Sequence, residues 1–523
     1  MKIRTILLAL TATQCVFAGP ARETPEGWYH DGQTLIAERR SVRADLPAAR
    51  NLILFVGDGM SFATVAAARI LEGQERGESG ESNLLYFESF PHTAFAKTYN
   101  TDRQTPDSAG TMTAMVTGVK TFAGALAVDQ YARFGDCESA QGRELVTLLD
   151  IASLAGLATG VVTNTRITHA TPAALFARTP HRRWESDAGM PEVARAAGCH
   201  DIARQLVEYD IGEGIDIVLG GGRREFLPEG SADPEYPGAR GLRIDGRNLI
   251  EEWQDRHSNG RYVWNLEQFR DAVKQAELPL LGLFEPSHMQ YEHDRANDEA
   301  GEPSLTEMTR ESIALLDDRG DEGYFLMVEG GRIDHAHHGN NAYRALTETI
   351  EFARAVEAAH DMTDPEETLI VVTADHGHAL VFAGYPVRGN PITGLVRRPD
   401  VDGNPGALQL DKDGHPMTTL RYFDGPGYRG DERPDYDDID ATDPDFRQEA
   451  AIGLRSATHS GEDVPVYATG PGAEVLHGVI EQNVIFHALL QAHPDLAPLA
   501  ERLADDHGLP DWQKVIDDSM AGR

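Results

Sequence analysis

The sequence contains few basic residues and almost no cysteine. It has 47 lysines and arginines against 84 aspartates and glutamates, so its formal net charge at pH 7 is −37. A surface of this sign repels nucleic acid and anionic lipid, so neither is expected as a partner. It indicates either a salty habitat, where counter-ions screen the repulsion, or a generally acidic exported protein.

Beyond the first twenty residues the sequence also lacks an apolar stretch long enough to span a bilayer. Residues 1–18 have the features of a secretory signal peptide: basic Lys2 and Arg4, an apolar stretch starting at Ile6–Leu10, and the small-residue pattern Val16–Ala18. An amphipathic N-terminal helix is the alternative. We therefore expect an exported protein, periplasmic or secreted.

Two cysteines, Cys137 and Cys199, remain once the predicted signal peptide is removed. In an oxidising compartment they can form one disulfide, but two free buried thiols are also compatible with the sequence. These residues alone leave both states open.

Short apolar runs rich in β-branched residues are separated by helical stretches, including 342–360 and 143–155. Several runs do not alternate polar and apolar residues, which favours strands buried on both faces of a mostly parallel sheet. The pattern predicts a three-layer α/β sandwich. The expected strands span Leu52–Val56, Gly160–Thr163, Ile215–Leu219, Tyr324–Val328 and Leu369–Thr373.

Polar residues of the kind that bind metals follow four of these strands. Sites in such sheets form at the carboxyl ends of the strands, so these residues are expected to meet at one edge. Independent solvated loops are the structural alternative. The residues concerned are Asp58, His169, Thr171, Glu329, Asp375 and His376.

The segment Glu329–His338 reads EGGRIDHAHH and concentrates acidic and imidazole groups after one predicted strand. If the chain becomes helical after Gly331, Asp334 and His338 are spaced i, i+4 and share a face. A carboxylate and an imidazole on one face are suitable ligands for zinc. Glu329 lies apart at the strand end, where it can serve a second ion.

Ser108 opens a predicted helix that extends to Val116, beside unpaired N–H groups and the positive end of the helix dipole. It is either a nucleophile for an anionic substrate or an ordinary N-cap. No G-x-S-x-G motif activates it, so a metal would have to lower its pKa. Arg182 suits bidentate phosphate binding or a surface ion pair, and His459 is a histidine between small residues.

Six motifs together resemble those of the alkaline phosphatases, in the same order, over about residues 27–490. The resemblance is nearest to the animal-type and marine bacterial branches, and with the acidic charge it implies a salt-adapted bacterial source. The motifs are Asp58–Met60, Asp107–Thr111, His169–Pro172, Glu329–His338, Thr373–His376 and His459–Asp463.

The resemblance implies a metal-dependent hydrolase that cleaves phosphate monoesters at alkaline pH through a phosphoserine on Ser108. Arg182 would hold the phosphate oxygens, and each subunit would bind two Zn²⁺ and one Mg²⁺. The implied ligands are Asp334, His338 and His459 for the first zinc; Asp58, Asp375, His376 and Ser108 for the second; and Asp58, Thr171 and Glu329 for magnesium.

The family pattern also assigns roles to residues outside these ligand sets. His169 and His335 stand where the enteric bacterial form has Asp and Lys, and they are expected to act as second-shell groups around the metals. Cys137 and Cys199 fall where animal-type relatives place a disulfide.

A fourth, calcium-binding site is implied by segments resembling those of animal-type enzymes. Its expected ligands are Glu235, Glu285, the carbonyl of Phe284 and, across a small insertion, Glu302. Calcium prefers several oxygen ligands. Scattered surface acids in an acidic protein are the alternative reading.

The resemblance further implies one domain over residues 19–523, with an N-terminal arm at about 19–50 and a crown-like insertion at about 385–455, assembled as a homodimer. Two other functions remain as alternatives. One is a phosphodiesterase or sulfatase on the same fold, although Ser108 lacks the C/S-x-P-x-R setting of sulfatases. The other is an acidic calcium-binding protein without turnover.

Overall fold

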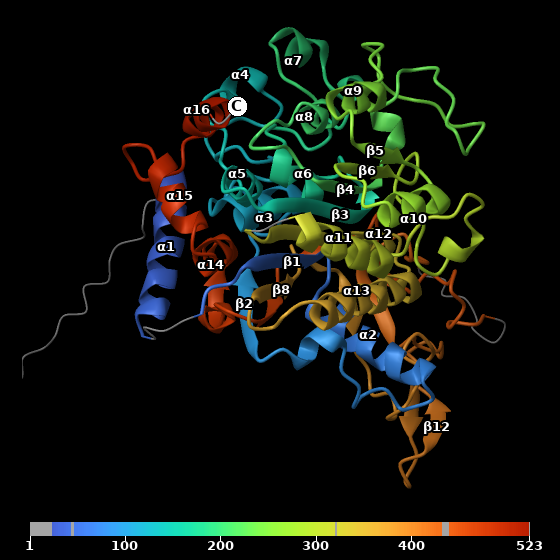
Figure 1. Cartoon of the computed structure of the whole chain (residues 1–523). Coiled ribbons are helices and arrows are strands. Elements are labelled where there is room, and N and C mark those ends of the chain that lie inside the picture. The colour runs from blue at the N-terminus through green and yellow to red at the C-terminus, as the bar shows by residue number, and fades with distance from the viewer. Residues whose placement is uncertain (1–22, 43–46, 320–321, 431–438, 522–523) are drawn as a thin grey trace, which may run out of the picture.

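The computed structural model describes residues 23–42, 47–319, 322–430 and 439–521. Its centre is a ten-stranded sheet with the order β17-β2-β16-β8-β1-β7-β3-β4-β6-β5 (Figure 1). Neighbouring strands are parallel, except that β16 is antiparallel to both β2 and β8. The strands are β1 (Asn51–Gly57), β2 (His92–Lys97), β3 (Ala158–Arg166), β4 (Ile217–Gly221), β5 (Arg261–Val263), β6 (Leu280–Leu283), β7 (Tyr324–Gly330), β8 (Thr368–Thr373), β16 (Val464–Thr469) and β17 (Gly478–Glu481).

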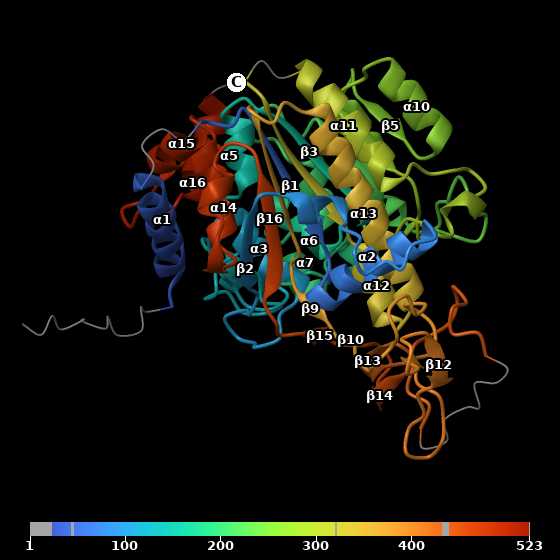
Figure 2. The same ribbon diagram turned by 90° about the horizontal axis from the view of Figure 1, so that it is seen from below.

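Helices cover both faces of this sheet (Figures 1 and 2). Helices α2, α11 and α13 pack on one face, and α3, α5, α6 and α14 pack on the other. The predicted three-layer α/β sandwich is therefore confirmed. The helices are α1 (Pro25–Ser41), α2 (Phe62–Glu75), α3 (Ser108–Thr117), α4 (Cys137–Ala140), α5 (Leu148–Leu154), α6 (Ala170–Phe176), α7 (Glu192–Ala196), α8 (Ile202–Val207), α9 (Leu249–Arg256), α10 (Leu266–Lys274), α11 (Leu305–Arg319), α12 (Arg332–His338), α13 (Ala342–Met362), α14 (Val484–Ala492), α15 (Leu496–Leu503) and α16 (Trp512–Ala521).

All five predicted strands and the helix expected at 342–360 are present. The strands β1, β7 and β8 are buried along their whole length, as continuous apolar runs require. The predicted start of the helix at 143–155 is wrong, because α5 begins at Leu148. Thr147 and Asp150 form a capping box that begins α5 there, while Leu145 instead donates its backbone N–H to the Ala127 carbonyl.

The region expected to form a crown contains small sheets that lie outside the central one (Figure 2). The region itself contributes β11 (Arg397–Pro399), β12 (Pro405–Leu408), β13 (Leu420–Gly425) and β14 (Ala450–Gly453), and the flanking segments contribute β9 (Gly377–His378), β10 (Leu380–Phe382) and β15 (His459–Ser460).

Helix α1 lies on the opposite side of the molecule from these small sheets and packs against α14 of the same chain (Figure 2). Asn483 donates a hydrogen bond of 2.7 Å from Nδ2 to the Trp28 carbonyl. The predicted signal peptide lies outside the described residues. Among those described, no helix has the length and apolar character needed to cross a membrane.

The disulfide implied by the resemblance is present, joining Cys137 to Cys199. The two Cα atoms are 5.9 Å apart, and the bond packs against the buried ring of Trp184. It thus ties the start of α4 to the loop that follows α7.

Candidate active site

Strand register brings the predicted ligand-bearing loops to one edge of the sheet. Val56 in β1 is opposite Glu329 in β7 and Thr373 in β8, and Thr163 in β3 is also opposite Glu329. The residues that follow these four strands therefore leave the sheet side by side.

The loop after β1 needs a glycine to approach helix α12. Gly59 has a φ of +68°, and a Cβ atom there would lie 3.2 Å from the Cα of Asp334. Its backbone N–H donates to Asp375 Oδ1 at 3.1 Å. The absence of a side chain thus lets Asp58, Asp334 and Asp375 approach one another.

Asp334 is the centre of the first cluster. Helix α12 presents Asp334 and His338 on one face, with His338 Nε2 3.2 Å from Asp334 Oδ2. His459 and His378 place their Nε2 atoms 3.4 Å from Asp334 Oδ1. His378 was not among the expected ligands, although the sequence shows it two residues after His376.

Hydrogen bonds to backbone carbonyls fix the tautomers of the predicted histidine ligands. Nδ1 of His338 donates to the Ala457 carbonyl at 2.6 Å, and Nδ1 of His459 donates to the Pro106 carbonyl at 2.9 Å. A carbonyl only accepts, so Nδ1 carries a proton and Nε2, which faces Asp334, is the ring nitrogen left for a cation. This arrangement prepares an imidazole to bind a cation.

A second cluster surrounds His376, whose Nδ1 donates to the Gly377 carbonyl at 3.2 Å. Its Nε2 lies 3.4 Å from Asp58 Oδ1, 3.3 Å from Asp375 Oδ2 and 3.1 Å from Ser108 Oγ. The serine hydroxyl therefore lies beside two buried carboxylates and the unprotonated nitrogen of an imidazole.

A third, oxygen-rich cluster is formed where β3 and β7 end. Glu329 Oε2 accepts hydrogen bonds from the Thr163 hydroxyl and, at 3.1 Å, from the Thr165 hydroxyl. Burial raises the pKa of Glu329 to about 7, while the hydrogen bonds from Thr163 and Thr165 oppose the rise. Asp58, His169 and Glu329 have ligand atoms within 4.8 Å of one another.

Several buried carboxylate oxygens of these clusters have no hydrogen-bond donor. Burial, together with Asp375, Asp334 and Glu329, raises the pKa of Asp58 well above its ordinary value. Burial also raises the pKa of Asp375 to about 6. Within the described residues, both oxygens of Asp58, Oε1 of Glu329 and Oδ2 of Asp375 have no hydrogen-bond partner.

Divalent cations satisfy all of these atoms at once, because they supply charge and accept several oxygen and nitrogen ligands. The first two clusters combine imidazole and carboxylate groups, and the third combines the carboxylates of Asp58 and Glu329 with the His169 imidazole, which are donors that suit divalent cations.

Arg182 is bound to Asp107, the residue that precedes Ser108. Asp107 caps α3, accepting from the Gly110 N–H, and accepts a 3.0 Å hydrogen bond from Arg182 Nη1. Although burial disfavours its charge, Arg182 holds the pKa of Asp107 below its usual value. Ser108 is thus the first residue of α3, with a guanidinium anchored beside it.

These groups open onto a cavity of about 550 Å³. A cavity of this size accepts a small molecule and leaves room for a substituent beyond a phosphate group. Its lining includes Asp107, Ser108, Arg166, His169, Arg182, Arg183, Glu185, Asp334, His335, His338 and His459.

His169 and His335, which were expected to contact the metal ligands and not the metals, lie together beside the cavity. The His169 and His335 ring centroids are 5.3 Å apart, and His169 Nε2 accepts from Arg182 Nη2 at 3.2 Å. His288, which sequence reasoning missed, lies 4.1 Å from His335 between ring centroids. It comes from the loop after β6, and no local motif distinguished it.

His337, for which the sequence suggested no role, holds α12 in place. Its Nε2 lies 2.9 Å from the Thr64 hydroxyl in α2, and its Nδ1 lies 2.7 Å from the Tyr422 hydroxyl in β13. It therefore connects α12 to α2 and to β13.

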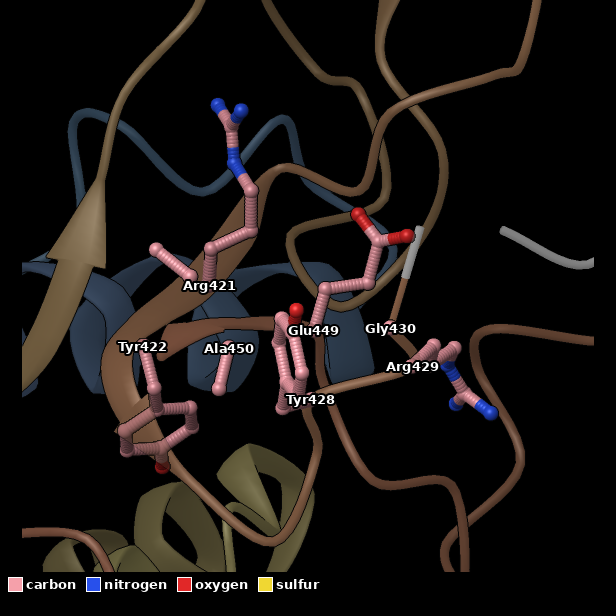
Figure 3. Close-up of a pocket in the computed structure, with 8 residues that line it drawn as sticks. Arg421, Tyr422, Tyr428, Arg429, Gly430, Glu449 and Ala450 are labelled. Atoms are coloured by element: carbon pink, nitrogen blue, oxygen red, sulfur yellow. The ribbon is translucent and has the colours of Figure 1, made fainter. Parts of the chain in front are cut away.

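Another cavity, of about 270 Å³, lies in the crown region (Figure 3). The Arg421 guanidinium and the Tyr422 ring extend from opposite sides of β13 in this view. Its described lining holds no serine, histidine or cluster of metal-ligating groups, so the chemistry belongs to the cavity at Ser108. The lining comprises Arg421, Tyr422, Tyr428, Arg429, Gly430, Glu449, Ala450 and Ala451.

The structure also groups acids at the expected calcium site. Glu235, Glu285 and Asp298 have oxygens within 4.8 Å of one another. Glu302 lies next to them, and burial and the nearby Glu285 raise its pKa to about 9. The Phe284 carbonyl accepts a 3.2 Å hydrogen bond from a buried arginine. Asp298 was not among the expected ligands.

Comparisons with known proteins agree on one family. Residues 49–494 match the family model described as alkaline phosphatase. The tissue-nonspecific alkaline phosphatase of Gallus gallus is 44% identical over 501 residues, covering 94% of each chain. An alkaline phosphatase of Gadus morhua is 46% identical over 451 residues, covering 85% of this chain and 91% of that protein.

Solved structures show the same fold at lower identity. The alkaline phosphatase of the Antarctic bacterium TAB5 has a TM-score of 0.58 and 21% identity, covering 86% of this chain and 98% of that one. The Thermus thermophilus alkaline phosphatase has a TM-score of 0.59 and 22% identity, covering 99% and 100%.

We expect cation binding in the first cluster to release protons. Burial disfavours a charged His338, but Asp334 raises its pKa to about 9, so at pH 8 the metal-free imidazole is protonated. A cation must displace that proton, and the release should vanish above its pKa. Calorimetric titration of the metal-free protein with Zn²⁺, in buffers of different ionisation enthalpy, should give about one proton at pH 8. Heats independent of the buffer would contradict the tautomer and charge assigned to His338.

Proposed function

The chain belongs to the alkaline phosphatase family, and we propose which of its residues carry out the reaction of that family. It hydrolyses phosphate monoesters to an alcohol and inorganic phosphate and depends on metal ions. The observation that carries the residue assignment is the position of Ser108 Oγ, 3.1 Å from His376 Nε2 and on the same cavity as Arg182.

We propose two zinc ions and one magnesium ion per subunit. The unpartnered buried oxygens and the directed Nε2 lone pairs support this assignment. When bound, the cations supply positive charge that polarises the phosphoryl group and lowers hydroxyl pKa values. The proposed ligands are Asp334, His338 and His459 for one zinc; Asp58, Asp375, His376 and Ser108 for the other; and Asp58, Thr171 and Glu329 for magnesium.

Ser108 is the proposed nucleophile. Its Oγ forms a bond to phosphorus as the bond from phosphorus to the ester oxygen breaks, and the departing oxygen takes a proton to become the alcohol. Water then cleaves the phosphoserine, releasing inorganic phosphate and restoring the serine hydroxyl. Throughout, the Arg182 guanidinium holds the non-bridging oxygens, because its planar donors match them and Asp107 anchors it.

Substrate preference tests the activity as a whole. The protein should hydrolyse p-nitrophenyl phosphate far faster than bis-p-nitrophenyl phosphate or p-nitrophenyl sulfate at alkaline pH, since a diester must fit a second substituent where Arg182 projects. Initial rates of p-nitrophenol release measure this directly. A higher rate on the diester would show that the chain is a phosphodiesterase.

Replacing Ser108 by alanine tests the nucleophile. Because the substitution removes the attacking oxygen but leaves the carboxylate and imidazole ligands, we expect kcat to fall at least about 10³-fold while metal content falls little. Acid quenching after mixing with ³²P-labelled substrate should trap label on the wild-type chain only. Normal turnover by the variant would reject Ser108 in this role.

We also propose that the acid cluster beside β6 binds calcium. Glu285 is buried and Glu235 is half-buried. Burial, together with the nearby Glu285 and Asp298, raises the pKa of Glu235 to about 8. Groups forced together in this way gain from a shared cation. Glu302 and the Phe284 carbonyl remain proposed ligands alongside Asp298.

Calcium should therefore raise the melting temperature of the wild-type protein, since a ligand that binds the folded state stabilises it. Asp298→Asn and Glu302→Gln each remove one charge, and the variant that loses most of the calcium-dependent shift identifies the stronger ligand. Calorimetry with and without about 1 mM Ca²⁺ gives the shift. A wild-type Tm indifferent to Ca²⁺ would refute the site.

Finer aspects of organisation are proposed on the same family basis. We propose an exported protein, periplasmic or secreted, whose residues 19–523 form one domain and whose arm and crown join two copies in a homodimer. The net charge of −37 supports a salt-adapted bacterial source. A mass of a single chain by light scattering would reject the dimer. N-terminal sequencing of the exported protein would show where the signal peptide is cleaved.

A further inference from the structure

An exposed arginine lines the catalytic cavity next to the one that serves the phosphate. Arg183 follows Arg182 in the chain, and both line the cavity that contains Ser108. Among the described residues, no ion pair or hydrogen bond involves the Arg183 guanidinium. An arginine without a partner in the lining of a phosphate site can bind a second anionic group of the substrate.

The other two arginines of the cavity are already paired. Arg182 donates to Asp107 at 3.0 Å, and Arg166 forms two hydrogen bonds of 2.7 Å with the two oxygens of Glu185. Their charges are therefore largely balanced within the protein. Arg183 is the guanidinium of this lining that can bind a new anion without breaking an existing pair.

The backbone that carries Arg183 is held firmly. Trp184 is 1% exposed, packs against Cys137 of the disulfide, and stacks on the His181 ring at 5.7 Å between centroids. On either side of Arg183, Arg182 N donates to the Gly124 carbonyl and the Trp184 carbonyl accepts from Ile202 N, both at 2.8 Å. Binding an anion at Arg183 thus costs side-chain ordering but little backbone ordering.

We propose that Arg183 favours phosphate monoesters whose leaving group carries a second phosphate. The inference rests on the proposed function, with the reacting phosphate held at Ser108 and Arg182. The leaving group then extends into a cavity of about 550 Å³ whose lining includes Arg183. Guanidinium and phosphate form parallel, charge-assisted hydrogen bonds, whereas an uncharged leaving group gains nothing from this contact.

The net charge of the chain makes such a contact selective. At −37, the protein as a whole repels a polyanionic substrate, so a local positive group at the cavity decides whether one is accepted. Arg183 supplies such a charge in the lining of this cavity. Its effect should appear in substrate binding, because the group does not touch the reacting atoms.

A matched pair of substrates isolates the effect. Butane-1,4-diol monophosphate and butane-1,4-diol bisphosphate share the reacting group and chain length and differ only in the remote phosphate. The quantity to measure is kcat/KM for release of the first phosphate, at low ionic strength, in the metal-loaded full-length protein. The ratio between the two substrates cancels any general loss of activity, and comparing this ratio between variant and wild type also cancels the statistical factor of two reacting ends.

Three variants distinguish the role of Arg183 from other effects. Arg183→Gln should lower the bisphosphate-to-monophosphate ratio about five- to tenfold, mainly through KM, and Arg183→Lys should retain most of it. Arg398→Gln removes the same charge from the exposed strand β11 and should leave the ratio unchanged. In about 0.5 M salt the wild-type preference should shrink, because exposed charges are screened.

Each result decides between the two proposals. An unchanged ratio in Arg183→Gln with normal monophosphate turnover would overturn the inference and leave the proposed function standing. A parallel fall on both substrates would also overturn it, since it would show that Arg183 supports the loop and not the leaving group. A wild-type protein that hydrolysed neither substrate would overturn the proposed function itself.

Discussion

Most of this structure depends on one electrostatic constraint, the crowding of carboxylates in a buried pocket. Asp58, Glu329, Asp334 and Asp375 are buried within reach of one another, and such a group of charges is unstable without cations or protons. The protein supplies part of the compensation. Histidines surround Asp334 and hold its pKa well below its ordinary value, although burial alone would raise it. The remaining unpartnered oxygens define where metal ions are needed.

The parallel sheet makes this crowding possible. Buried strands with fixed register deliver Asp58, Glu329 and Asp375 to the same edge, and glycine at position 59 avoids a side chain that would press against Asp334. The surrounding layers then fix orientation: the Ala457 and Pro106 carbonyls set the tautomers of two histidine ligands. Stability of the core and reactivity of the site are thus consequences of the same packing.

Anion recognition is organised separately, on a loop outside the strand ends. The loop that carries Arg182 is bounded by the disulfide and by the buried ring of Trp184, so its guanidinium groups have a fixed base in an otherwise strongly acidic chain. Asp107 links this loop to the start of α3 and therefore to Ser108. Positive charge is concentrated where a phosphate must bind, while the overall charge of the chain excludes other polyanions.

The sequence by itself determined the features that depend on near neighbours: the apolar strands, the helix at 342–360, and the i, i+4 placement of Asp334 and His338. The order of its motifs, compared with a known family, added the other expected ligands and the disulfide. Only the tertiary structure showed that His378 joins Asp334, that His288 lies against His335, and that Asp298 approaches Glu285. It also shortened the helix expected at 143–155, because a capping box and a contact with Ala127 decide where α5 begins. Those features depend on which distant loops the packed sheet brings together, and no local pattern contains that information.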